Sequence, residues 1–173
     1  MTQIISNRLH NWALRYLELR PRSSKEIRDY LKLKFTRWVR KGWLTVENEE
    51  ADNVTNLIEE VIAKLTNLKL VDDEAFTKTW VASRGHKKSF KILKSELFKK
   101  GISKEIIEET LRQFELTEGG QEELIKKVVT KVLSKYLKLP RSEARQKLYG
   151  YLVRRGFEWE EIKGVVDGLL KES

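Results

Sequence analysis

Cysteine is absent from this sequence, and proline and glycine are scarce, with two and nine residues respectively among 173. Without cysteine the chain can form neither a disulfide framework nor a thiolate metal site, which fits a reducing, cytoplasmic environment. The shortage of proline and glycine leaves little for a turn-rich β fold. Leu, Lys, Glu and Arg, which are strong helix formers, dominate instead. The composition therefore predicts an all-α protein.

Several features that define common functional classes are also missing. No stretch of about 18 uncharged apolar residues is present, so we expect no membrane span, and the N-terminus has no apolar signal-peptide core. His10 and His86 are the only histidines, and no phosphate-binding loop motif occurs. The pair Asp72 and Asp73 is explained more simply as a helix N-cap than as a metal site. We therefore expect no catalytic site, no metal and no cofactor, and the chain is not predicted to be an enzyme.

Positive charge is what the chain has in excess. It carries 35 Lys and Arg residues against 26 Asp and Glu residues, a net charge of +9, and its pI is about 9.6. Such a surplus indicates a polyanion or an acidic protein as partner. The alternative is that the surplus serves only solubility.

Apolar residues at helical spacing predict about nine helices separated by short breaks. Ser23 and Ser103 are expected to cap helix N-termini, and the Ser-x-x-Glu pattern at Ser23 predicts a capping box. The helix that follows Ser89 is expected to bury Phe98 and to end at Gly101 in a left-handed conformation. The expected helices span about 7–19, 23–35, 52–68, 72–84, 89–100, 103–114 and 121–137, then from the break at 140–142 to 155, and from about 159 onward.

The helices repeat in triplets. The pattern of residues 13–20 recurs at 77–84, and the helix end at 97–102 matches 152–157, each with an apolar residue, two cations, a glycine and another apolar residue. This favours tandem three-helix repeats that form an elongated, curved, solenoid-like rod. The expected repeats are 1–70, with an insert near 36–53, then 71–116 and 117–173.

Three motifs occur in order along the chain. The first is Ala13-x-x-Tyr16-Leu17-x-x-Arg20-x-Arg22-Ser23-x-x-Glu26-Ile27. The second is Val71-Asp72-Asp73-x-x-Phe76-x-x-x-Trp80-Val81-x-x-Arg84, followed by Glu96-Leu97-x-x-Lys100-Gly101-Ile102. The third is Leu152-x-x-Arg155-Gly156-Phe157. Together, over about residues 8–170, they resemble the RecX family, regulators of the bacterial recombinase RecA.

The resemblance implies a fold and a function. It implies three-helix repeats in a curved rod that binds along the groove of a RecA–DNA filament and inhibits ATP hydrolysis and strand exchange. That activity belongs to homologous recombination, DNA repair and the SOS response. Two departures concern the fold. Ser89 stands where the family usually has a glycine nearby, and residues 36–53 look inserted, so the first repeat need not pack in the usual way.

The basic residues are the remaining candidates for a binding site. Residues 84–100 carry seven cations against Glu96 alone, and residues 126–155 carry ten against Glu143 alone. Because these clusters fall on equivalent helices of adjacent repeats, we expect one stripe that faces the acidic surface or the bound DNA of the filament. The alternative is that they are ordinary solvated helix faces. The candidate contacts are Arg84, Lys87, Lys88, Lys91, Lys94, Lys99, Lys100, Arg145, Lys147, Arg154 and Arg155.

Two tryptophans stand apart from the apolar helix faces. Trp38 and Trp43 flank Arg40 and Lys41 within the inserted stretch. Aromatic rings beside cations are suited to stacking on single-stranded bases. The alternative is that both rings anchor the insert in the hydrophobic core.

Two functional hypotheses follow. The first is a monomeric regulator that binds a RecA filament and modulates it without catalysis. The second is a general DNA-binding helical-repeat protein that acts through its basic stripe on single- or double-stranded DNA. A filament ligand discriminates between RecA-coated and bare DNA, whereas a DNA binder holds bare DNA with a steep salt dependence.

Overall fold

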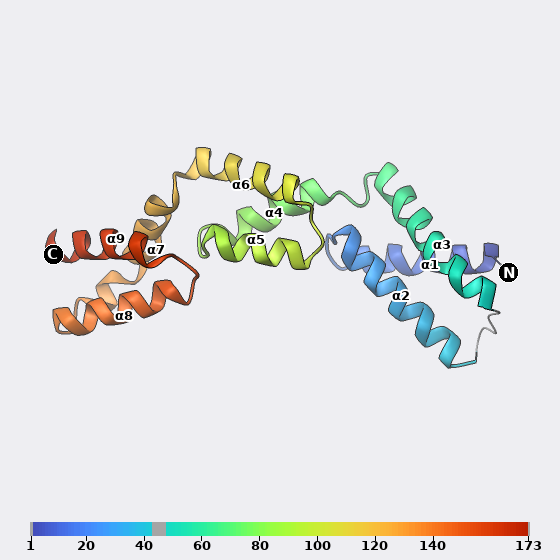
Figure 1. Cartoon of the computed structure of the whole chain (residues 1–173), viewed down its shortest axis with the longest axis horizontal. Helices are drawn as coiled ribbons and strands as arrows, with labels where there is room; N and C mark the ends of the chain where they lie inside the picture. The colour runs from blue at the N-terminus through green and yellow to red at the C-terminus, as the bar shows by residue number, and fades with distance from the viewer. Residues whose placement is uncertain (1, 43–47, 173) are drawn as a thin grey trace. The chain divides into compact units, whose positions relative to one another are not determined.

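A computed structural model describes the backbone of residues 2–42 and 48–172, and all of their side chains except those of 48–52, 171 and 172. The described residues form nine α-helices and no strand (Figure 1). None of these helices combines the length and apolar character that a bilayer crossing requires. The helices are α1 Thr2–Leu17, α2 Ser24–Arg40, α3 Asn48–Asn67, α4 Asp73–Arg84, α5 Phe90–Lys99, α6 Lys104–Glu118, α7 Gln121–Tyr136, α8 Arg141–Val153 and α9 Trp159–Glu172.

The helix ends follow the predicted signals. The Ser23 hydroxyl accepts the Glu26 backbone N–H and the Glu26 carboxylate accepts the Ser23 N–H, which confirms the capping box. At the start of α6 the Ser103 hydroxyl accepts the Ile106 backbone N–H, which confirms Ser103 as its N-cap. Gly101 and Gly156 have φ angles of 76° and 80°, the left-handed conformation expected after α5 and α8.

Some predicted boundaries were wrong. Helix α1 begins at Thr2, five residues before the expected start at Asn7. Helix α2 continues through Thr36 to Arg40, so the first residues of the supposed insert extend this helix by more than one turn. The basic side chains there are good helix formers, and Trp38 provides the next core residue. The expected linker at 117–120 is also shorter, since α6 runs to Glu118.

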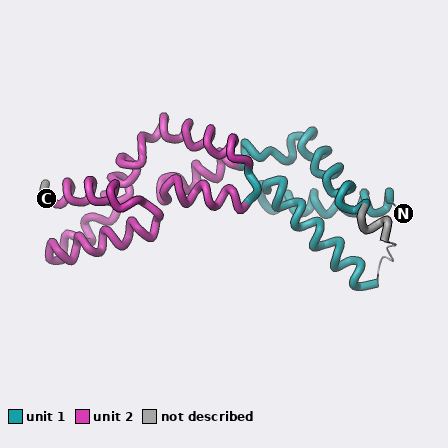
Figure 2. Tube along the Cα trace, viewed as in Figure 1, with its two compact units in different colours: residues 1–76, 100–102 teal, residues 77–99, 103–173 magenta. Residues whose placement is uncertain are grey.

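The chain divides into two compact units (Figure 2). Unit 1 comprises residues 1–76 and 100–102. In it, helices α1, α2 and α3 contact one another pairwise, and their facing sides supply a single hydrophobic core. Its most deeply buried side chains are Ile5, Leu9, Ile27, Leu31, Ile58 and Leu65.

Unit 2 comprises residues 77–99 and 103–173. Helices α7, α8 and α9 contact one another, and Phe90 at the start of α5 packs against their core. Leu93 and Leu97 of α5 and Ile107 of α6 are fully buried as well. The boundaries between the units fall within α4, after Phe76, and on either side of residues 100–102.

Within unit 1, the start of α2 is bonded to two later segments of the chain. The Ser23 hydroxyl donates to the carbonyl of Lys100 (2.7 Å), and the Ser24 N–H donates to the Asp73 carboxylate at the start of α4 (2.9 Å). Gly101 lies so close that an added Cβ would meet Lys25 at 2.5 Å. Ser23 is fully buried, so these bonds satisfy polar groups that water cannot reach.

Within unit 2, the start of α5 repeats this arrangement. The Ser89 N–H donates to the carbonyl of Arg155 (3.0 Å), and the Phe90 N–H donates to the side-chain oxygen of Gln121 at the start of α7 (3.3 Å). An added Cβ at Gly156 would meet Ile92 at 2.5 Å. The same joint therefore connects the second helix of one repeat to the following repeat in both places.

This joint predicts a strong effect of Gly156→Ala. A side chain at φ 80° in contact with Ile92 should lower the free energy of unfolding by about 1–3 kcal/mol, because the left-handed conformation alone costs about 1–2 kcal/mol. Urea denaturation of the purified chain measures the change. Gly164→Ala is the matched control, because its Cβ meets nothing within 4 Å in the interior of α9. It should raise stability by about 0.5–1 kcal/mol. Equal changes in the free energy of unfolding for the two substitutions would contradict the close approach of Gly156 to α5.

A second prediction concerns acid stability. Partial burial raises the pKa of Glu26, but hydrogen bonds from Arg20, Lys100 and the Ser23 backbone outweigh this and lower it from 4.5 to about 2. The group's contribution to stability is therefore complete above about pH 4.5 and is lost as the pH falls through about 2. Between these values the wild type should lose about 1 kcal/mol more than Glu26→Gln, a figure already reduced for solvent screening. Chemical denaturation at a series of pH values tests this, and parallel curves would refute it.

Candidate functional site

Part of the expected basic stripe comes together in unit 2. The end of α8 meets the start of α5, where the Arg155 guanidinium donates to the Lys87 carbonyl at 2.6 Å. Lys91 on the first turn of α5 forms an ion pair of 2.8 Å with Glu158. Arg154 is exposed beside Arg155. Cations that are distant in sequence therefore share one region of unit 2.

Other residues of the expected stripe lie elsewhere. Arg145 and Lys147, on the first turns of α8, bind Asp167 at 2.9 Å and Glu143 at 2.8 Å. Lys100 belongs to unit 1, where it forms the ion pair with Glu26. The eleven candidates therefore do not form a single group of free cations.

Two further candidates belong to a polar network between α4 and α5. Lys88 is paired with Glu96, which also accepts the indole N–H of Trp80 at 3.1 Å. The Arg84 guanidinium stacks 3.5 Å from the centre of the Trp80 ring. Partial burial raises the pKa of Glu96, but the bonds from Lys88 and Trp80 outweigh it and the pKa is lowered. Reversal of Lys88 to Glu would therefore set two carboxylates against each other, so Lys88 is a poor position for testing binding.

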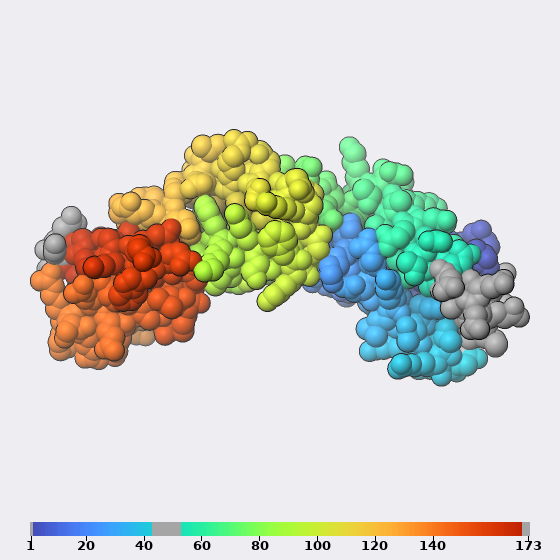
Figure 3. Space-filling view, viewed as in Figure 1, coloured from blue at the N-terminus to red at the C-terminus, as the bar shows by residue number. Residues whose placement is uncertain are grey.

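The outer side of α5 keeps positive charge. Lys94 and Lys99 form no ion pair with any carboxylate in the described part of the chain, and Lys91 has only its exposed partner Glu158. Phe98 lies among them and is 50% exposed. We call Lys91, Lys94, Phe98 and Lys99 the α5 basic face. The surface of α5 is yellow-green in Figure 3, where part of it is open to view.

The exposure of Phe98 corrects the expectation that it is buried. Leu93 and Leu97 point into the core, and Phe98 follows Leu97 by about 100° around the helix, which turns it away. The alignment of the repeats already indicated that residue 98 faces outward. Phe98 aligns with Val153, a smaller residue that is likewise half exposed, at 51%. A large aromatic side chain at a position that is outward in both repeats is a candidate contact.

The two tryptophans proposed for base stacking are not equivalent. Trp38 is 8% exposed and makes edge contacts with Trp12 and Phe35, with ring centres 5.6 and 6.3 Å away. This burial leaves no open ring face for a base and favours the alternative of a hydrophobic anchor. Trp43 lies outside the described residues.

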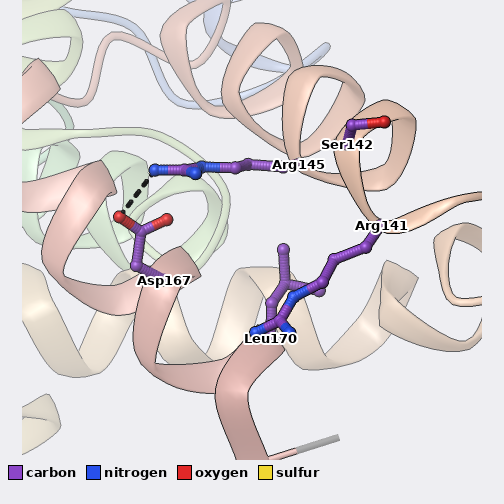
Figure 4. A pocket seen from close by; sticks show the side chains of 5 residues that line it. All are labelled: Arg141, Ser142, Arg145, Asp167 and Leu170. Atoms are coloured by element: carbon purple, nitrogen blue, oxygen red, sulfur yellow. Dashed lines mark hydrogen bonds and ion pairs between the residues drawn. The ribbon is translucent and has the colours of Figure 1, made fainter.

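A pocket of about 560 Å³ lies between α8 and α9 (Figure 4). The Arg145 guanidinium binds Asp167, and it also donates to the Tyr149 hydroxyl, which itself bonds to Asp167. Because Arg145 is already neutralised, Arg141 is the one cation lining this pocket that has no carboxylate partner among the described residues. The pocket therefore contributes a single cation without a carboxylate partner.

Comparison with known protein families finds a match in each of the three expected repeats. Residues 10–37 match the first three-helix domain of RecX, residues 72–111 the second, and residues 120–166 the third. The chain belongs to the RecX family. The three RecX matches fall on α1–α2, α4–α6 and α7–α9, in the order expected of tandem three-helix repeats.

Individual relatives agree with the RecX assignment. Regulatory protein RecX of Prosthecochloris aestuarii is 32% identical over 92% of this chain and 92% of its own length. Regulatory protein RecX of Bacillus velezensis is 35% identical over 91% of this chain. The chain spans about half the length of that relative and of those from Streptococcus gordonii and Streptococcus sanguinis. The crystal structure of RecX from Lactobacillus salivarius has a TM-score of 0.69 and 25% identity, with 96% of this chain and 97% of the other covered.

The position of Phe98 can be checked by stability alone. Phe98→Ala should change the free energy of unfolding by less than about 0.5 kcal/mol, because half of the side chain is in solvent. Leu97→Ala, one residue earlier and fully buried, should cost about 2–5 kcal/mol. Urea denaturation of both variants distinguishes the outward from the inward position, and a comparable loss in Phe98→Ala would place Phe98 in the core.

Proposed function

We propose that this RecX-family chain binds RecA filaments on DNA and inhibits their ATP hydrolysis and strand exchange in recombination and DNA repair. The observation that supports this best is the match to all three RecX domains in their order. The curated relatives are named regulatory proteins. A regulator needs a binding surface rather than a catalytic site, and the chain offers such a surface on α5.

The α5 basic face has the composition of a protein contact. Exposed aromatic residues contribute strongly when a partner buries them, and polar or charged neighbours around them exclude water. Phe98 supplies the aromatic group and Lys94 and Lys99 supply charge. Their positive charge fits an acidic surface on the partner and accelerates encounter with it.

The alternative is a general DNA-binding protein, and free surface cations favour it. Lys131, Lys135 and Lys138 are exposed and form no ion pair with a carboxylate among the described residues of unit 2. The two functions can be distinguished by the form of DNA on which the protein acts. A filament regulator acts at RecA-coated DNA, whereas a general binder holds bare DNA in proportion to its phosphate contacts.

The decisive measurement is RecA's single-stranded-DNA-dependent ATP hydrolysis, titrated with this protein. We expect inhibition at ratios well below one chain per RecA protomer. The variant Lys94→Gln/Phe98→Ser/Lys99→Gln should raise the midpoint of inhibition about tenfold or more, since loss of one interface anchor alone costs on the order of 1–2 kcal/mol. The control variant Lys104→Gln/Arg112→Gln removes two exposed cations that already have the partners Glu108 and Glu109, and it should inhibit like the wild type.

Affinity for bare DNA is measured beside it. No effect on RecA, together with tight and salt-sensitive binding to bare DNA, would overturn the proposal in favour of the general DNA binder. Inhibition that the α5 variant and the control variant reduce equally would show that net charge, rather than the α5 basic face, carries the effect.

A further inference from the structure

Two helices of unit 1 carry an unusual arrangement of rings and cations. Arg8, Trp12 and Tyr16 follow one another at four-residue spacing on α1, and Tyr30, Lys34 and Trp38 do so on α2. Residues three and four apart lie on the same side of a helix, so each set forms a stripe. The two stripes contact each other along their length.

Cations contact rings along the line where the two stripes meet. The Arg8 guanidinium lies 5.9 Å from the centre of the Trp12 ring, and the Lys34 ammonium lies 5.5 Å from the centre of the same ring. Lys34 is also 5.9 Å from the Tyr30 ring. Tyr30 stacks on Tyr16 with centres 4.0 Å apart and planes 8° apart.

Arg22 completes the row at its other end. Its guanidinium lies 3.9 Å from the centre of the Tyr16 ring. Its Nε is buried and has no hydrogen-bond partner among the described residues. We call the row of Arg8, Trp12, Lys34, Tyr30, Tyr16 and Arg22 the cation–aromatic ladder.

The ladder's charge is not neutralised by the helices that form it. Helix α1 contains no Asp or Glu, and α2 contains none from Tyr30 to its end at Arg40. The two carboxylates of α2 are already engaged, Glu26 by Arg20 and Lys100 and Asp29 by Lys25. Arg8, Arg22 and Lys34 form no ion pair with a carboxylate in the part of the chain that the structure describes.

The rings hold the cations without consuming their hydrogen-bond donors. A guanidinium stacked on an aromatic ring uses its flat face, and the N–H groups at its edge stay available for a planar anion such as phosphate. Stacking also restricts the long side chains before binding, which lowers the entropy lost on contact. A row of cations held in this way is suited to bind a polymer that carries one negative charge on each of its repeating units.

We propose that the cation–aromatic ladder of unit 1 binds the phosphodiester backbone of DNA. From Arg8 to Tyr16 the α1 stripe rises about 12 Å, which spans three to four phosphates of one B-form strand at about 3.4 Å each. The ladder makes its contact with bare DNA and needs no recombinase, so it does not rest on the proposed function. The aromatic rings set the positions of the cations, and the backbone phosphates bind to them.

The test uses the full chain, fluorescently labelled single-stranded and duplex oligonucleotides, and a series of salt concentrations. Arg8→Gln/Lys34→Gln should weaken binding at low salt about tenfold. It should also reduce the slope of log affinity against log salt by about 1.4 on single strands, or about 1.8 on duplex, because each lost phosphate contact removes about 0.7 or 0.9. The substrate that shows the loss identifies the form of DNA that the ladder contacts.

The control is again Lys104→Gln/Arg112→Gln, which removes one lysine and one arginine from paired positions on α6. The exchange variant Arg8→Lys/Lys34→Arg keeps both charges and should keep the salt slope. An unchanged slope in Arg8→Gln/Lys34→Gln on both DNA forms, or an equal drop in the control, would overturn the proposal. Polyglutamate binding that Arg8→Gln/Lys34→Gln abolishes, with DNA binding intact, would assign the ladder to an acidic protein instead.

Discussion

The rest of the structure depends on how a glycine turn fits against the start of a helix. At two places a residue in the left-handed conformation, Gly101 or Gly156, brings a backbone carbonyl onto the capping serine of an earlier helix, Ser23 or Ser89. A short three-helix repeat buries little apolar surface, so it needs contact with its neighbour. The close approach requires glycine, because any side chain there would overlap the neighbouring helix. The joint therefore constrains the sequence both at the glycine of the later repeat and at the serine of the earlier one.

Local signals in the sequence were sufficient for most of the fold. Serine caps, glycine helix ends and helical periodicity act within a few residues, so the starts of α2 and α6 and the turns after α5 and α8 could be predicted. The extension of α2 through Arg40 could not, because a run of cations fits a solvated helix as well as a loop. The same limit applies to Phe98. An aromatic residue next to Leu97 looks like core until the helix is packed and one of the two must turn outward.

The candidate site was less accessible to prediction than the fold. A count of charges identified the basic helices, but the value of each cation depends on partners that are distant in sequence, such as Glu158 for Lys91 and Glu26 for Lys100. Ion pairs with these carboxylates occupy several of the expected contact residues, whereas Lys94 and Lys99 form no ion pair among the described residues. The cation–aromatic ladder was missed because its two stripes lie on different helices. Only the packing of α1 on α2 joins Tyr16 to Tyr30.

The bonds that the first residues of α2 and α5 make at the joint also have a direction. In these bonds the earlier repeat supplies the donors, from Ser23 and Ser24 or from Ser89 and Phe90, and the later repeat supplies the acceptors. In the alignment that places Phe98 opposite Val153, the position of Ser89 corresponds to Ala144 of α8, which has no hydroxyl and whose N–H is already bonded to the Pro140 carbonyl. The repeats are thus joined head to tail and are not interchangeable. A circularly rearranged chain that placed the α7–α9 repeat before the others would present an alanine with no free donor where the next repeat's carbonyl requires one.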